Sequence, residues 1–231
     1  MRTPSILSIT RSAAVALLLA GSLAGCKKTA ATEPVVPGSI AVVQGDNQSV
    51  QAGKDLPNPV VLRVLSKTGT AMAGVPVALV VAEGGGTVSP ASGVTDAKGE
   101  YSARWTLGNA ALNSIRATVP SLDPLKIYAT GILPSDILVA QGNWQTAKAG
   151  AALTTSIIVR VVGSGNVPLV GIPVLFQIVS GGGAISPATG VTNALGEVTG
   201  KWTLGSFVGL QYATVTAGTL TPQTLTATAT P

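Results

Sequence analysis

The chain has few of the side chains that catalysis requires. Its 231 residues include no histidine and a single cysteine, Cys26. A Ser-His-Asp or Cys-His catalytic arrangement therefore cannot form. The nine Asp and Glu residues are spread along the chain and form no cluster, although a pair of carboxylates for glycoside cleavage is possible in principle. We expect a protein that is not an enzyme and that needs no cofactor.

Cys26 stands out because of the sequence that precedes it. Arg2 and Arg11 give a basic start, residues 12–24 are uncharged and rich in Ala and Leu, and the chain then reads Leu23-Ala24-Gly25-Cys26. A basic start, a short apolar core and small residues at a cleavage point are the features of a secretory signal peptide. The apolar core is shorter than the ~20 residues that a membrane-spanning helix needs.

The Leu-Ala-Gly-Cys sequence resembles the lipobox of bacterial lipoproteins. This resemblance implies that residues 1–25 are removed and that Cys26 becomes the first mature residue, carrying fatty acyl chains such as palmitate. The alternative is an ordinary signal peptide that happens to contain a cysteine. Lys27 stands where an Asp would resemble an inner-membrane retention signal. We therefore expect a lipid anchor in the outer membrane of a Gram-negative cell, or otherwise on the outer face of the cell membrane.

Composition describes a folded, turn-rich mature chain. It has 28 Gly, 15 Pro, 46% hydrophobic and 10% charged residues, whereas disordered chains are less hydrophobic and more charged. Loss of residues 1–25 leaves a net charge of +3, with the basic residues scattered apart from Lys27 and Lys28 beside the anchor. This pair suits either anionic lipid head groups or a solvated spacer. No basic stripe with interleaved aromatic residues is present, so nucleic acid is not an expected partner.

The mature chain contains an internal duplication with a spacing of 97 residues. The motifs that recur are Val75-Pro76-Val77 with Ile172-Pro173-Val174, Gly84-Gly85-Gly86 with Gly181-Gly182-Gly183, and Trp105-Thr106-Leu107-Gly108 with Trp202-Thr203-Leu204-Gly205. Late in the repeat we align Ala117-Thr118-Val119 with Ala213-Thr214-Val215, a slip of one residue. A period this long indicates domains and not solenoid repeats. We predict a tether over 26–36 and two tandem domains over 37–132 and 133–231.

Each copy has the pattern of short β-strands. Residues 100–107 alternate between polar and apolar side chains, as do residues 197–204, and a period of two marks a strand with one buried face. Further runs rich in β-branched residues cover 60–65, 75–81, 157–162 and 172–179, and turn-forming clusters separate them. Many short strands in units of about 100 residues predict an all-β fold of two tandem antiparallel β-sandwiches.

A family resemblance agrees with that fold. The run from Gly93 to Trp105, GVTDAKGEYSARW, resembles the late-strand signature of bacterial immunoglobulin-like domains of the invasin/intimin type. Gly74-Val75-Pro76-Val77 and the Gly84-Gly85-Gly86 cluster fit the same family, and both copies carry the pattern. The resemblance implies an immunoglobulin-like sandwich that serves as a spacer or adhesive module at the bacterial surface. In contrast to the large adhesins, we expect no membrane β-barrel region before the two domains and no lectin-like tip after them, which disfavours host-cell adhesion.

The glycine clusters and the carboxylates have simple structural interpretations. Gly84-Gly85-Gly86 lacks the Gly-Lys-Ser/Thr of a phosphate loop, so we interpret it as a tight connection with positive φ. Asp96, Glu100 and Asp46 are conceivable Ca²⁺ ligands, but such a site needs 6–8 oxygens, and Asn193 replaces Asp96 in the second copy. The simpler interpretation is that Asp96 and Asn193 close a turn through their side chains. We expect no metal site.

Three tryptophans divide into two classes. Trp105 and Trp202 follow the buried alternation of their strands, so we predict that they anchor the cores. Trp144 has Asn47 as its counterpart and lies in a polar stretch. It is either a ligand contact, stacking on a sugar or a partner surface, or a residue that packs at the junction between the domains.

The remaining charged residues suggest structural pairs on the solvated faces. Arg63 and Arg160, Glu100 and Glu197, and Arg104 and Lys201 keep their charge type in both copies, so we expect cross-strand ion pairs among them.

Two function classes remain. The first is a non-catalytic interaction, adhesion or spacer module that contacts an unidentified envelope or surface protein through strand edges or loops. The second is a carbohydrate-binding module that uses Trp144 or Tyr128 to contact a glycan. The aromatic content of only 3% disfavours the second class.

Overall fold

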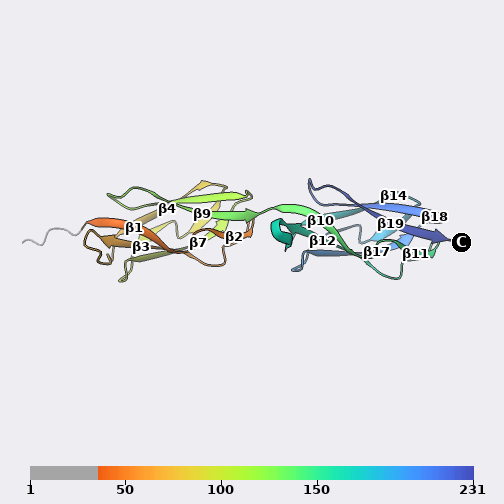
Figure 1. The fold of residues 1–231 in the computed structure, drawn as a ribbon, viewed down its shortest axis with the longest axis horizontal. Helices are drawn as coiled ribbons and strands as arrows, with labels where there is room; N and C mark the ends of the chain where they lie inside the picture. Colours follow the sequence, from red (N-terminus) through yellow and green to blue (C-terminus); the bar gives the residue numbers. More distant parts are fainter. Residues whose placement is uncertain (1–35) are drawn as a thin grey trace, which may run out of the picture. The chain divides into compact units, whose positions relative to one another are not determined.

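The structure is a computed structural model that describes residues 36–231, and these form short strands (Figure 1). Within these residues no helix is both long and apolar enough to cross a membrane. The first repeat contains β1 (Pro37–Gln44), β2 (Gln48–Gln51), β3 (Val60–Ser66), β4 (Pro76–Glu83), β5 (Gly86–Ser89), β6 (Ser92–Val94), β7 (Glu100–Leu107), β8 (Leu112–Thr118) and β9 (Leu125–Ile132).

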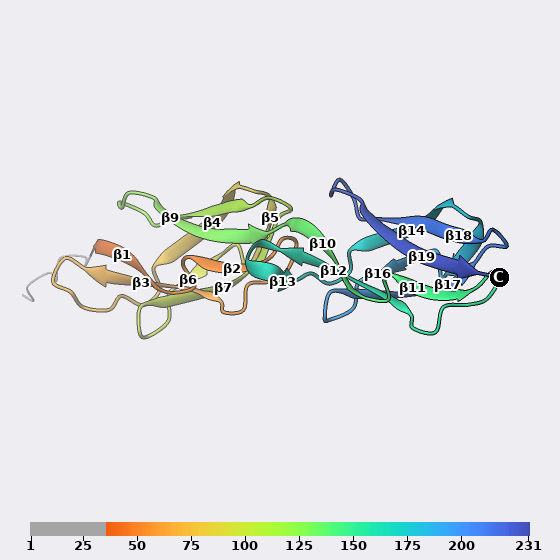
Figure 2. The same cartoon turned by 45° about the vertical axis from the view of Figure 1, so that its right-hand side comes forward.

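The second repeat contains the same series of strands. They are β10 (Pro134–Gln141), β11 (Gln145–Lys148), β12 (Ile157–Gly163), β13 (Val167–Pro168), β14 (Pro173–Ser180), β15 (Gly183–Ser186), β16 (Thr189–Val191), β17 (Glu197–Leu204), β18 (Gly209–Thr216) and β19 (Gln223–Thr230), with a 3-10 turn at Ser164–Asn166. β13 is an addition that pairs with the end of β12 (Figure 2).

The strands of each repeat form two sheets with the immunoglobulin arrangement. In the first repeat the orders are β1-β3-β7-β5 and β2-β9-β8-β4-β6, and the second repeat has β10-β12-β17-β15 and β11-β19-β18-β14-β16. If the principal strands are lettered in chain order, these sheets correspond to A-B-E-D and to G-F-C with an added strand on each side. The prediction of two all-β, immunoglobulin-like sandwiches is confirmed.

Two strand pairs depart from the predicted antiparallel pattern. β2 pairs in parallel with β9, and β11 pairs in parallel with β19. The chain makes this change by crossing between sheets after β1 and after β10, which belong to the opposite sheets. In each crossing a glutamine fixes the turn: Gln48 donates from Nε2 to the carbonyls of Gly45 (3.1 Å) and Asn58 (2.9 Å). Gln145 makes the equivalent contacts with Gly142 and Thr155.

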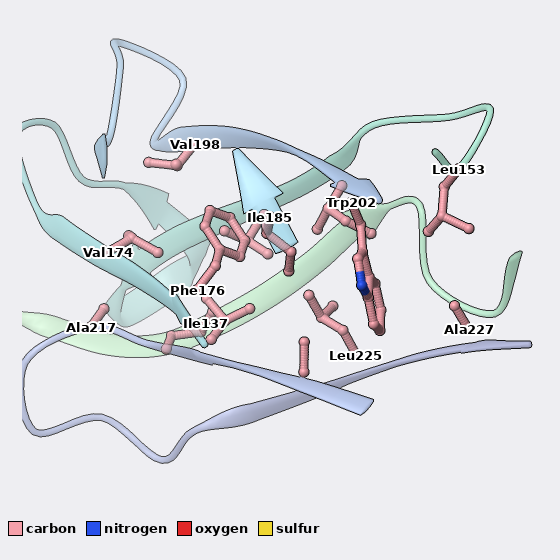
Figure 3. Packing of buried hydrophobic residues seen from close by; sticks show 14 of the residues in the cluster. Ile137, Leu153, Val174, Phe176, Ile185, Val198, Trp202, Ala217, Leu225 and Ala227 are labelled. Carbon is pink, nitrogen blue, oxygen red and sulfur yellow. The ribbon is translucent and has the colours of Figure 1, made fainter. Parts of the chain in front are cut away.

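The predicted alternation places the core side chains between the sheets. Trp105 and Trp202 are almost fully buried, as expected for core anchors. In the second repeat the indole of Trp202 extends from β17 toward Leu225 on the opposite layer, while Phe176 and Ile185 fill the neighbouring space (Figure 3). Along β7 every second residue is buried, and the residues between them are exposed or half-buried. The period of two in the sequence therefore matches the burial of the strand.

The two cores keep their volume by paired exchanges. Phe176 occupies the position of Leu79, and Gly200 occupies that of Ala103. A Cβ on Gly200 would lie 3.4 Å from the Phe176 ring and 2.7 Å from Ile185. The Phe176 ring would meet such a Cβ at ordinary contact distance, whereas Ile185, which replaces the smaller Val88, would clash with it. The missing methyl group on β17 therefore makes room for Ile185, because close-packed interiors tolerate swaps that conserve volume.

The late alignment of the repeats is wrong. In the sheets Leu79 pairs with Ala117 and Phe176 pairs with Val215. Ala117 therefore corresponds to Val215, at a spacing of 98, and not to Ala213. The second repeat has gained one residue between β17 and β18, where the similar run Ala-Thr-Val obscured the insertion.

The turn interpretations are confirmed. All three glycines in each of the clusters 84–86 and 181–183 have φ between 77° and 88°, a region that favours glycine. The Asp96 Oδ1 accepts hydrogen bonds from the N–H groups of Lys98 (2.8 Å) and Glu100 (2.9 Å). Asn193 makes the same two contacts with Leu195 and Glu197. These side chains close the turns before β7 and β17.

The cross-strand ion pairs are confirmed in part. Arg63 pairs with Glu100 across β3 and β7, and Arg160 pairs with Glu197 across β12 and β17. These are the ion pairs of residues 36–231, so Arg104 and Lys201 have no such partner there. The Lys201 Nζ instead donates to the Thr154 carbonyl at 3.2 Å.

Each sandwich has two ends, which we name by the path of the chain. The leading end is the one at which the chain enters, at Pro37 in the first repeat and at Pro134 in the second. The trailing end is the opposite one, where β9 and β19 finish. Only Leu133 lies between β9 and β10, so the connection between the two repeats is a single residue long.

The turn at Asp96 predicts an acid-dependent difference between the repeats. Hydrogen bonds from the backbone of Glu100 and then of Lys98 lower the pKa of Asp96 below its ordinary value of 3.8. A lowered pKa means that this stabilisation is complete above pH 3.8 and is lost as the pH falls through the lower folded-state value. Asn193 does not titrate.

We therefore expect the variant Asp96→Asn to be less sensitive to acid than the unmodified chain. The measurement is the urea midpoint of unfolding at pH values above and below 3.8, with the lower values compared between the two proteins. Parallel loss of stability in both proteins would show that Asp96 makes no contribution.

Candidate interaction surfaces

The predicted lipidation site, Cys26, lies outside the described residues. Lipidation therefore remains a prediction from the sequence. The other predicted site residue, Trp144, is described in full. It begins the turn into β11 with a φ of 60°, and its N–H donates to the Thr226 carbonyl at 2.8 Å. The Asn143 Oδ1 accepts from both Trp144 N (3.1 Å) and Thr226 N (2.7 Å), so the backbone is held while the indole projects outward.

The junction interpretation of Trp144 is wrong. The side chain is 72% exposed, and its backbone partner, Thr226, lies along β19 and not beside Leu133. A residue that packs two domains together would have lost most of its exposed area. The ligand-contact alternative stays a prediction.

At the corresponding turn of the first repeat the aromatic residue is Tyr128, which lies on β9 and not in the turn itself. Asn47 occupies the position of Trp144, and its N–H donates to the Tyr128 carbonyl at 2.8 Å. Asp46 takes the role of Asn143 and accepts from the Tyr128 N–H at 3.0 Å. Tyr128 is 39% exposed. Each repeat thus carries one exposed ring at this turn, which is the geometry that sugar stacking would use.

A second exposed aromatic residue was not predicted. Phe207 lies in the loop between β17 and β18 at the trailing end of the second repeat, and it is 72% exposed. Val208 and Leu210 beside it are also exposed. With Ser180, Gly181 and Ser206, Phe207 and Leu210 line a hollow of about 420 Å³. We name residues 205–210 the Phe207 loop.

A buried glutamine organises the Phe207 loop. Gln211 is fully buried, and its Oε1 accepts from the Gly205 N–H at 2.8 Å. Its Nε2 donates to the carbonyls of Gly205 (3.1 Å) and Phe207 (2.7 Å). Three hydrogen bonds from one buried amide fix the loop, because unmaking them would leave buried polar groups without partners.

In the first repeat a shorter buried amide, that of Asn113, holds the corresponding loop. Asn113 is also fully buried. It accepts from Gly108 N at 3.0 Å and donates to the Ala110 carbonyl at 2.8 Å. Asn113 lies five residues after its glycine, and Gln211 lies six residues after Gly205. The side chain has gained one methylene where the loop has gained one residue.

Both repeats also have an apolar groove at the leading end, on the outer face of the sheet that contains β4 or β14. In the first repeat the groove has a volume of about 620 Å³ and is lined mainly by Pro76, Ala78, Val94, Thr118 and Pro120. In the second repeat the volume is about 500 Å³, with Pro173, Leu175, Val191 and Thr216 in the lining.

The carboxylates of residues 36–231 are dispersed, and several are engaged in structural contacts. No group of three or more potential metal ligands occurs in this part of the chain. Glu100 is engaged with Arg63, and Asp46 with the backbone of Tyr128. Burial raises the pKa of Tyr101, whose hydroxyl donates to the Pro90 carbonyl at 2.6 Å.

Comparisons with known proteins give structural likenesses alone. No family model matches the chain, and no curated protein sequence matches it. Similar solved structures include the Yersinia pseudotuberculosis adhesin InvE, with 21% identity over 83% of this chain and 59% of that chain and a TM-score of 0.43. Others are the D0-D1 domain of intimin (17% identity, 83% and 95% covered, TM-score 0.35) and invasin, described as a bacterial integrin-binding protein (18%, 84% and 39%, TM-score 0.46).

The chain spans about 59% of the length of the InvE structure and 39% of the invasin structure. These neighbours are of the invasin/intimin type, the family that the late-strand motif resembles. Because the identities and TM-scores are low, the assignment of the immunoglobulin arrangement rests on the strand topology and not on these likenesses.

The match between Gln211 and its loop can be tested directly. We expect Gln211→Asn to lower the free energy of unfolding by about 1–3 kcal/mol, because the shorter amide cannot reach both Gly205 and Phe207. Deletion of Val208 in the same protein restores the loop length of the first repeat and should recover part of the loss. Urea denaturation of the two single variants and of the combined one measures the coupling. Simple additivity of the two effects would contradict the proposed match.

Proposed function

We propose that this chain is a non-catalytic lipoprotein of the cell envelope whose two immunoglobulin-like repeats act as a protein-interaction, adhesion or spacer module. The proposed organisation is a signal peptide over 1–25, a lipidated tether over 26–36, and domains over 37–132 and 133–231. The observation that carries the interaction role is the exposed Phe207 on a loop fixed by a buried glutamine.

The Phe207 loop has the properties of a binding anchor. Aromatic side chains supply much of the energy at protein interfaces, and a loop already held in one conformation loses little entropy on binding. The corresponding loop of the first repeat carries Ala110 and Ala111. There a Cβ on Gly131 would lie only 2.2 Å from the Ala110 carbonyl. This loop therefore packs against the end of β9.

The lining of the hollow beside Phe207 favours a protein over a sugar. Its side chains are those of Phe207, Leu210, Ser180 and Ser206. A sugar would need several convergent hydrogen-bonding groups around its hydroxyls, and two serines supply few. An apolar side chain from a partner protein would fill the hollow without unpaired polar groups.

The second candidate function is carbohydrate binding. The observation that favours it is the recurrence of an exposed ring, Tyr128 in one repeat and Trp144 in the other, at corresponding turns. Such rings can stack on sugar faces. This function would use surfaces that are separate from the Phe207 loop.

The proposed anchor limits the reach of the first repeat. Residues 26–36 span at most about 35–40 Å when fully extended. The first repeat would therefore stay close to the bilayer, with its leading end nearest along the chain to Cys26. A lipid anchor with a short tether suits a module that contacts other envelope components.

The anchor can be tested by intact-mass analysis of the native product. We expect a chain that begins at residue 26 and carries the additional mass of fatty acyl chains. In Cys26→Ser the acyl mass should be absent. A free thiol on a chain that still carries residues 1–25 would contradict the proposal.

The interaction role can be tested by comparing two matched variants in envelope crosslinking. Phe207→Ala and Trp144→Ala each remove one ring that is 72% exposed, so neither should alter the thermal midpoint of unfolding. We expect Phe207→Ala to reduce the yield of the specific crosslinked partner by about tenfold or more, and Trp144→Ala to leave it unchanged.

A glycan array with the delipidated variants separates the second function. Loss of glycan binding in Trp144→Ala, with no protein crosslink sensitive to Phe207→Ala, would overturn the protein-interaction proposal in favour of carbohydrate binding.

A further inference from the structure

The first repeat contains a like-charge pair that the fold does not explain. Arg116 on β8 lies directly opposite Lys126 on β9, and both side chains are exposed. Neither takes part in the ion pairs of residues 36–231, which are Arg63–Glu100 and Arg160–Glu197. Like charges directly opposite each other destabilise a sheet. Because neither cation forms an ion pair within residues 36–231, both are available to an external anion.

The second repeat shows that the sandwich does not need this pair. The corresponding residues are Thr214 and Thr224, which lie opposite each other on β18 and β19. A Thr–Thr pair is favourable in a sheet. The two cations therefore distinguish the first repeat from the second, although both repeats have the same strand arrangement.

Apolar residues flank the two cations on the same outer face. Val80 on β4 lies opposite Arg116, so Val80, Arg116 and Lys126 form a row across three strands. The next row of the face, toward the leading end, pairs Ala78 with Thr118 in the wall of the 620 Å³ groove. Val94 at the groove edge is 60% exposed, as is Val80. We name Val80, Val94, Arg116 and Lys126 the basic–apolar patch.

Further cations lie at the same end of the first repeat. Lys67 follows β3, and its backbone N lies 2.4 Å from the place that a Cβ on Gly38 in β1 would take. Lys98 lies in the turn closed by Asp96, whose carboxylate is directed to the backbone. The counterparts of Lys67 and Lys98 are Ser164 and Leu195.

Acidic residues offset this charge only in part. Asp96 and Asp123 lie in the leading-end turns of the first repeat, and Glu100 is paired with Arg63. Glu83 on β4 lies one row from Arg116 and accepts from the Ser114 hydroxyl at 3.0 Å. Four cations, Arg116, Lys126, Lys67 and Lys98, therefore stand against three carboxylates without an ion pair, Asp96, Asp123 and Glu83. The leading end keeps a net positive charge.

We propose that the leading end of the first repeat binds the surface of an anionic bilayer through the basic–apolar patch. Lipid phosphates would lie across Arg116 and Lys126, and Val80 and Val94 would enter the interfacial region beside them. Cations next to exposed aliphatic side chains are the combination that interfacial membrane binding uses. The inference rests on the proposed function and deepens it, because a tether over 26–36 joins the proposed lipid anchor directly to this end of the first repeat.

A bilayer fits the patch better than other polyanions. Nucleic acid would be expected to use aromatic side chains between the cations for stacking, and the patch has only valines. A small free anion would not account for the exposed Val80 beside Arg116, where the second repeat has Gln177 beside Thr214. The patch therefore matches a surface that is both anionic and apolar.

The test uses a chain that begins at residue 27 and so carries no acyl group. Both cores lie between Ile40 and Ala229, so this chain retains all the strands. We expect it to cosediment with vesicles of equimolar phosphatidylcholine and phosphatidylglycerol, to release as salt is raised, and not to bind vesicles of phosphatidylcholine alone. Arg116→Thr combined with Lys126→Thr copies the second repeat and should weaken binding about 30-fold.

The matched control is Lys54→Thr combined with Lys148→Thr. It removes the same charge from exposed lysines outside the patch, and we expect binding within about twofold of the unmodified chain, since the attraction to the surface falls off within a Debye length. Equal weakening by both double variants would mean that only net charge matters, and would overturn the proposal. Displacement by inorganic phosphate at low concentration, or retention on heparin without vesicle binding, would also overturn it.

A stability measurement separates this role from a structural one. Lys126→Glu replaces the like-charge pair with an ion pair and should raise the midpoint of unfolding while it abolishes vesicle binding. A lower midpoint would show that Lys126 supports the fold, which contradicts the proposal. Because the test protein lacks Cys26, its result is independent of the acylation experiment, and failure of one leaves the other readable.

Discussion

The contact between the two sheets is the constraint on which each sandwich depends. Residues 36–231 contain no cysteine, so no disulfide joins the sheets and side-chain packing alone must do so. Trp105 and Trp202 occupy the same buried place in the two cores. Truncation of such a ring typically costs about 3–5 kcal/mol, a large share of the stability of a domain this size.

This dependence on packing explains how the cores have diverged. Ile185 is larger than its counterpart Val88, and the exchange of Ala103 for Gly200 removes a methyl group that would lie 2.7 Å from the Ile185 side chain. The outer faces have no such constraint, and they differ freely. Exchanges in the core are therefore limited by the need to fill the interior, whereas exchanges on the outer faces are not limited by packing.

Much of the fold is encoded in local sequence. Alternation over 100–107 and 197–204 reports burial directly, because a strand has one face toward the core. Glycines with positive φ and the Asp96 turn are visible as residue types that suit those conformations. The parallel strands β2 and β11 were not predicted, because four residues are too few to show a period. Their position is fixed by Gln48 and Gln145, whose partners lie ten residues away.

The surfaces were less predictable than the fold. Trp144 was identified because it departs from the buried pattern, and that signal is local. Phe207 was missed because its loop is recognisable only after the repeats are aligned correctly, and the run Ala213-Thr214-Val215 led to the wrong register. The opposition of Arg116 and Lys126 depends on the pairing of β8 with β9, which neither residue reveals alone.

A duplicated chain supplies its own reference for separating folding from function. Thr214 and Thr224 show that a sandwich of this kind forms without cations at that pair, and Ala110 shows that it forms without an aromatic residue in the trailing loop. A substitution that leaves the fold intact in one copy is not explained by folding in the other. The destabilising pair of Arg116 and Lys126 belongs to the copy nearer the proposed anchor. The exposed Phe207 ring belongs to the copy farther along the chain. If a membrane and a protein partner engage the module at different places, selection acts separately on the two copies, and the differences would be distributed in this way.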